Sequence, residues 1–181
     1  SLDRGIRALE ERLQSTEKDS SDYPYLPFCY YVLSLFSPDY VLFSTSEKGS
    51  YYQLFNGLVL MQRGVKGVAQ KQLETILKEF RTLDSLGWVN FQSPGYFLND
   101  IQLNALLLDL MRQLGYEGPE REALVRYLFK MRNGNYWYST KDTAFVVMSL
   151  LHVRPDKGTF SVNLGGNLAS FFTELGEQIE M

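Results

Sequence analysis

The chain has 181 residues, a formal net charge of −3 and 45% hydrophobic residues, which is the composition of an ordinary globular protein. Its 12 Phe, 12 Tyr and 2 Trp can fill a hydrophobic core, which excludes a disordered protein. The single Cys excludes an intrachain disulfide and a multi-thiolate zinc site, and the single His excludes a centre that needs two imidazoles. The slightly acidic balance, without a stripe of Lys and Arg, argues against nucleic-acid binding.

The chain begins at Ser1, and a helical pattern follows at once without an initiator Met or the apolar segment of a leader. We therefore expect a fragment of a longer protein, whose compartment cannot be read from its first residues. No apolar run reaches the length of about 18 residues that a membrane-spanning helix needs, so no such helix is predicted.

Apolar residues recur at helical spacing through most of the chain. This pattern predicts seven helices, at residues 2–14, 24–36, 51–61, 68–83, 101–114, 119–132 and 143–151. Segment 101–114 is apolar on nearly all sides, which is typical of a helix buried on most faces, and Gly115 is expected to end it. Segment 68–83 has one apolar and one charged side and is expected to cover such an inner helix.

Two segments have other patterns. Residues 40–48 fit either a short strand or the start of a helix. After Pro155, the residues Phe160, Val162 and Leu164 alternate with polar ones, which predicts a β-strand. We therefore expect an all-α domain over residues 1–155, and a short β appendage or the start of a following β-domain over 156–181.

The chain also carries an internal repeat. A shift of 40 residues aligns Tyr96-Phe97 with Tyr136-Trp137, and the apolar segment 105–108 with 145–148. Each unit has an aromatic loop, a polar helix start and an apolar helix, followed by an amphipathic partner where the chain allows. Helix pairs that repeat about every 40–45 residues are typical of an open helical solenoid or a closed α/α toroid, and the repeat does not choose between them.

The second copy of this repeat opens with a predicted helix cap. In Ser139-Thr140-Lys141-Asp142 a hydroxyl precedes a carboxylate by three residues, the pattern of a capping box. From the cap alone, Asp142→Ala is expected to lower stability by about 1 kcal/mol.

The segment Gly134–Phe145, with the sequence GNYWYSTKDTAF, resembles the last helix pair of the thioester domain in bacterial α2-macroglobulin-like proteins. In that family a Trp-x-Ser/Thr-Thr-x-Asp-Thr-Ala run opens the final inner helix. The following segment Gly158–Gly166, GTFSVNLGG, is similar to the first strand of the next β-domain. The resemblance extends over about Tyr96–Gly166, and before Trp88 only the helical pattern is compatible.

The resemblance implies an α/α toroid, here a partial ring, within a broad-spectrum endopeptidase inhibitor that traps proteases outside the cytoplasm. It implies a non-catalytic segment without cofactor or metal, whose partners are proteases and other domains of the parent chain. The family's thioester motif is Cys-x-Glu-Gln, and Cys29 is followed by Tyr30-Tyr31-Val32, so no reactive residue is assigned.

The motif residues that match the family imply structural roles. Trp137 would fill a gap between helices, Ser139 or Thr140 would cap the final inner helix, and Asp142 would bind the amides of its first turn. Thr143 completes the motif.

Two other functions stay open. An α/α-barrel enzyme acting on carbohydrate would use Asp100 and Asp142 as paired carboxylates, each beside an aromatic loop that could stack sugar rings. This enzyme needs both carboxylates in one open cleft and a raised pKa on at least one of them. The other alternative is a helical-repeat scaffold that binds a protein. Cys29 and His152 lie in no metal-binding motif.

Overall fold

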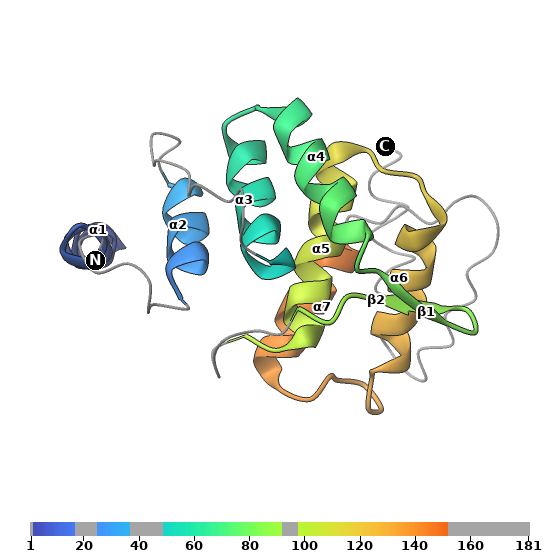
Figure 1. Cartoon of the computed structure of the whole chain (residues 1–181). Helices are drawn as coiled ribbons and strands as arrows, with labels where there is room; N and C mark the ends of the chain where they lie inside the picture. Colours follow the sequence, from blue (N-terminus) through green and yellow to red (C-terminus); the bar gives the residue numbers. More distant parts are fainter. Residues whose placement is uncertain (1, 17–24, 37–48, 92–97, 152–181) are drawn as a thin grey trace, which may run out of the picture.

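The computed structural model describes residues 2–16, 25–36, 49–91 and 98–151. In these ranges the chain is mostly helical, with one small antiparallel sheet (Figure 1). The elements are α1 (Leu2–Thr16), α2 (Leu26–Ser34), α3 (Ser50–Gln62), α4 (Lys66–Leu77), β1 (Arg81–Leu83), β2 (Leu86–Trp88), α5 (Asp100–Leu114), α6 (Pro119–Lys130) and α7 (Thr140–Leu150). The predicted helical fold class is therefore confirmed. The predicted strand after Pro155, the whole segment 156–181 and the segment 40–48 lie outside the described residues.

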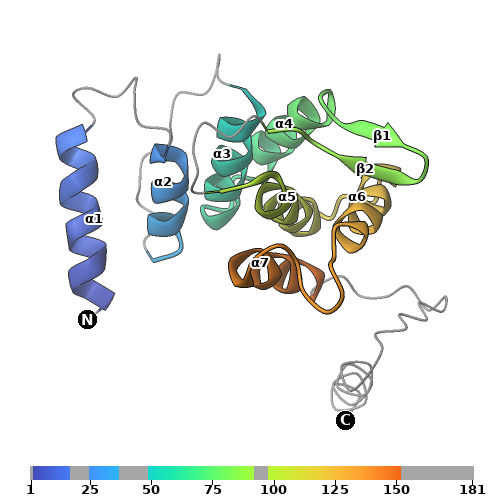
Figure 2. The ribbon, with the colours of Figure 1, turned by 90° about the horizontal axis from the view of Figure 1, so that it is seen from below.

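Helices α3, α4, α6 and α7 are arranged around α5. This helix packs against α3 and α7, and also against α4 and α6, which lie above it and to its right in Figure 2. Helix α2 lies against α3, and α1 lies against α2. The described part of the chain thus alternates a central helix with a covering one from α3 to α7, as the repeat predicts.

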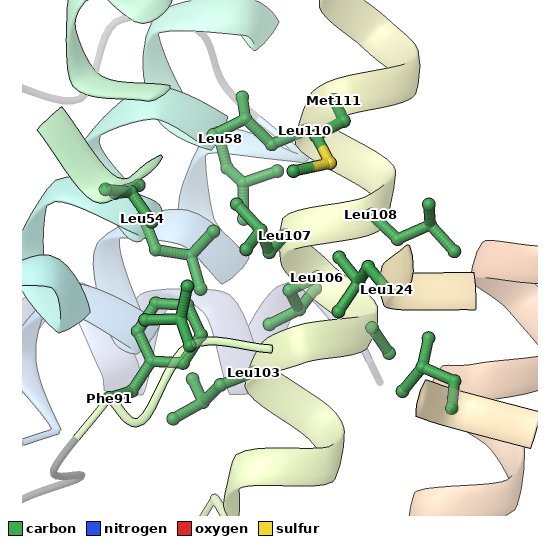
Figure 3. Close-up of a cluster of buried hydrophobic side chains, with 14 of the residues drawn as sticks. Leu54, Leu58, Phe91, Leu103, Leu106, Leu107, Leu108, Leu110, Met111 and Leu124 are labelled. Atoms are coloured by element: carbon green, nitrogen blue, oxygen red, sulfur yellow. The ribbon is translucent and has the colours of Figure 1, made fainter. Parts of the chain in front are cut away.

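Helix α5 supplies more of the main hydrophobic cluster than any other described element, because apolar side chains leave it in several directions (Figure 3). Its fully buried members are Leu103, Leu107, Leu108, Leu110 and Met111. The helix ends at Gly115, whose φ of 69° lies in the left-handed region that favours glycine. The prediction of a helix buried on most faces is confirmed.

The predicted helix at 68–83 is wrong at its C-terminal end. Helix α4 ends at Leu77, and β1 pairs with β2 through a two-residue turn in which Asp84 has a φ of 55°. The hairpin packs on α6, where Trp88 stacks on Tyr127 at 5.4 Å between ring centroids. Arg126 Nε also donates a hydrogen bond to the carbonyl of Ser85, at 2.6 Å. These contacts stabilise the hairpin relative to a continuation of α4 to residue 83.

Gly87 lies in the part of the hairpin that packs closely against α6. A Cβ at this buried position would lie 2.8 Å from Cβ of Ala123 and would overlap the ring of Phe80. We expect Gly87→Ala to lower the free energy of unfolding by about 1–3 kcal/mol, the usual cost of overpacking, as measured by urea denaturation. Gly67→Ala on α4 is the control, because nothing lies within 4 Å of its Cβ position. Equal stability of the two variants would contradict the steric role of Gly87.

Candidate functional site

Helices α5 and α7 begin next to each other, and each begins with a side-chain cap. Asn99 accepts a hydrogen bond from the amide of Gln102 at 3.0 Å, and Ser139 Oγ accepts one from the amide of Asp142 at 3.1 Å. Gln102 and Asp142, which occupy the same place in the two helices, are 40 residues apart in the chain. The repeat therefore corresponds to two parallel helices with equivalent first turns.

The carboxylate of Asp142 joins these two first turns. Its Oδ1 accepts hydrogen bonds from Asn99 Nδ2, at 2.7 Å, and from Gln102 Nε2. Its Oδ2 accepts the hydroxyl of Ser139 at 2.8 Å. The side chain has no exposed surface, and it lies in the first turn of α7, where the helix dipole favours a negative charge. We call these four residues, Asn99, Gln102, Ser139 and Asp142, the Asp142 cluster.

The second acid of the carbohydrate alternative has a different environment. Asp100 is half-buried, and burial raises the pKa of its carboxyl group, while a hydrogen bond from the backbone of Phe91 partly opposes this increase. A raised pKa is one property that the enzyme would need. Because Asp142 is completely buried, however, the two carboxylates cannot share an open cleft.

An open groove of about 650 Å³ lies elsewhere, between the first turn of α3 and the end of α4. Tyr51, Tyr52, Lys78, Arg81 and Phe91 are among the residues that line it. Neither Asp100 nor Asp142 lines this groove. The geometry of the described residues therefore gives the paired-carboxylate mechanism no support.

Trp137 connects the end of α6 to the start of α7. It is 5% exposed, and its indole Nε1 donates a hydrogen bond to the carbonyl of Leu128 at 2.6 Å. Its backbone amide donates to Thr143 Oγ1 at 3.1 Å, and that hydroxyl donates to the carbonyl of Ser139 at 2.9 Å. The matched motif is thus one hydrogen-bonded turn, in which Ser139 is the cap and Thr140 is an exposed first residue.

Ser139→Ala removes the cap of α7, so we expect it to lower the free energy of unfolding by about 1 kcal/mol. Thr140→Ala is the matched control, because its side chain is exposed and it is not the cap; it should change stability by less than about 0.5 kcal/mol. Urea denaturation of both variants measures the difference. If Thr140→Ala costs as much as Ser139→Ala, the cap has been placed at the wrong residue.

Sequence reasoning missed Asn104, which is completely buried in α5. Its Oδ1 accepts the amide of Val89 at 2.9 Å. Its Nδ2 donates to the carbonyls of Val89 and Asp100, both at 2.8 Å. One side chain therefore fixes the segment after β2 to the central helix. The available signal was a polar residue within an otherwise apolar helix, which must find partners when it is buried.

Within the described ranges, the residues with reactive or metal-binding side chains are not gathered into a metal-binding cluster. Cys29 is only partly exposed on α2, and burial raises the pKa of its thiol, which disfavours the nucleophilic thiolate. A search of the described ranges finds no group of three His, Cys, Asp or Glu placed to hold a metal ion. None of the described helices has the length and apolar character needed to cross a membrane. His152 lies outside the described residues.

Comparison with known proteins gives one similarity. Over 149 residues, or 82% of the chain, the sequence is 24% identical to the α2-macroglobulin of Thermotoga maritima. The chain is similar to an α2-macroglobulin. It spans only 9% of the length of that relative. No family model matches the chain, and no solved structure matches it.

Proposed function

We propose that this chain is a non-catalytic segment of an α2-macroglobulin-like protease trap, from the C-terminal part of an α/α toroid of the thioester-domain type. The observation that carries the proposal is the similarity to an α2-macroglobulin over 82% of the chain. The alternation of central and covering helices from α3 to α7 supports it, because a toroid needs such pairs.

The hydrogen bonds of the motif residues also support the proposal of a non-catalytic segment. Trp137 donates a hydrogen bond to α6, and Asp142 accepts hydrogen bonds from Asn99 and Gln102 at the start of α5. Ser139 and Thr143 form the hydrogen bonds of the first turn of α7 itself. Such residues set the geometry of a helical array, and the buried carboxylate of Asp142 is not available to a substrate. The segment would therefore contribute to the trap by holding helices in position, without taking part in a chemical step.

The partners and the compartment follow from this proposal. The parent protein would enclose proteases outside the cytoplasm, and the segment itself would contact the other domains of the parent chain. No cofactor is required, because enclosure limits the access of large substrates without any chemical step in this segment.

Proteolysis assays on the parent protein test the proposal. A broad-specificity protease is mixed with the parent, and cleavage of a large protein and of a small peptide is followed in parallel. Enclosure predicts loss of cleavage of the protein while cleavage of the peptide survives. The 181-residue chain alone is the control and should protect neither substrate. If the protease bound to the parent still cleaves the large protein, the trap proposal is wrong.

A further inference from the structure

Helix α7 is held to the rest of the described structure mainly through one face. This face packs against α5 and buries Asp142, Val146 and Ser149. On other sides of the same helix, Met148 is 66% exposed and Leu151, just after it, is 52% exposed. By contrast, α3 and α5 each pack against three or more other helices. Separation of α7 would therefore disrupt much less packing than separation of either of those helices.

The polar contacts between α5 and α7 are concentrated at one end. Asn99 and Gln102 each donate a hydrogen bond to the carboxylate of Asp142. Hydrogen bonds to a charged group contribute more than those between neutral groups, because the partners attract each other more strongly. The contact between the helices thus combines a modest apolar face with one strong polar link at their N-terminal ends.

We infer that α7 opens from α5 as a separate cooperative unit, and that Asp142 is the latch that keeps it closed. Proteins open locally in contiguous units whose free energies depend on the contacts that each unit breaks. Among the described residues, α7 is held mainly by its packing on α5, by the latch and by the turn at Trp137, so its opening requires less free energy than unfolding of α3 to α5. This inference does not depend on the protease-trap proposal.

Hydrogen–deuterium exchange of the complete 181-residue chain tests whether α7 opens as a separate unit. Amides of residues 144–150 are expected to exchange at least about tenfold faster than those of residues 104–114, because the second group opens only with the core. If the two groups exchange at the same rate, α7 does not open separately and the inference is overturned.

The variant Asn99→Ser tests the latch. Serine is also a good N-cap, so α5 keeps its cap, but the shorter side chain loses the amide that donates to Asp142. Exchange in residues 144–150 should become about tenfold faster, the factor expected for one hydrogen bond to a charged group, while exchange in α3 and α4 stays unchanged. Equal acceleration in all helices, or no acceleration in α7, would overturn the assignment of Asp142 as a latch.

A matched control removes a side-chain hydrogen bond elsewhere. Thr75 Oγ1 donates to the carbonyl of Lys71 within α4, at 2.9 Å. Thr75→Val deletes that bond, which lies wholly within α4 and is not part of the contact between α5 and α7, so it should leave the exchange of α7 unchanged. If Thr75→Val accelerates α7 as strongly as Asn99→Ser does, the exchange of α7 reports general stability and the latch is rejected.

Discussion

Trp137→Ala is expected to lower the free energy of unfolding by about 3–5 kcal/mol, the usual cost of truncating a large buried aromatic residue. The indole is 5% exposed and belongs to the main hydrophobic cluster. Its removal leaves a cavity between α6 and α7 and takes away the hydrogen bond to the carbonyl of Leu128. Urea denaturation followed by far-ultraviolet circular dichroism measures the change, since the signal does not depend on the deleted Trp.

Two variants separate the parts of this effect. Trp137→Phe keeps an aromatic ring and loses the indole N–H, so it should cost less than the alanine variant. Tyr138→Ala is the neighbouring control, because that side chain is 86% exposed and should contribute little. A loss for Tyr138→Ala as large as that for Trp137→Ala would show that the turn as a whole is sensitive, and that filling the gap between helices is not the role of Trp137.

Asp142→Ala is expected to cost about 3 kcal/mol, more than the value of about 1 kcal/mol expected from a cap alone. The carboxylate is completely buried and accepts hydrogen bonds from Asn99, Gln102 and Ser139. Alanine leaves the buried amide of Gln102 without this acceptor, and unsatisfied buried groups are costly. Urea denaturation measures the difference in the free energy of unfolding.

Asp109→Ala is the matched control for Asp142→Ala. Asp109 also lies on a central helix and bonds to Arg112 and Gln113, but these partners are on its own helix and the pair is partly exposed. Such an ion pair contributes about 0–1 kcal/mol. If Asp109→Ala and Asp142→Ala cost the same, then the bonds between α5 and α7 add nothing beyond an ordinary carboxylate on a helix.

The sequence predicted the helical parts of the fold well where local signals agree. Segment 101–114 is apolar on nearly all sides, begins after a polar residue and is followed by Gly115, and the structure places α5 at Asp100–Leu114. The cap of α7 at Ser139 was equally visible, since its hydroxyl and the carboxylate of Asp142 have the spacing of a capping box.

The β-hairpin could not be predicted in the same way. Its strands are three residues long, too short for an alternating pattern to be distinguished from a helical one. What selects the hairpin is its contact with α6, where Trp88 meets Tyr127 and Gly87 meets Ala123. Those partners are distant in the sequence, and tertiary packing of this kind overrides local propensity.

The hydrogen-bond partners that Asp142 has on α5 could not be predicted from the local sequence either. Its spacing to Ser139 predicted a local cap, but nothing local indicates that Asn99 and Gln102 lie beside it. The repeat at a shift of 40 residues contained the information, because equivalent residues of neighbouring parallel helices lie side by side. A buried polar residue at one position of a repeat is therefore a reason to examine the equivalent position for its partner.

The bonds of Asn104 to Val89 also protect the sheet. A short exposed strand offers free amides and carbonyls that another chain can pair with, which is a route to aggregation. Asn104 occupies both the amide and the carbonyl of Val89, directly after β2. The amide of Val89 is therefore not available to donate to an incoming strand, and its carbonyl already accepts one hydrogen bond. The side chain that fixes the hairpin to α5 thus also limits how far a foreign strand could extend this small sheet.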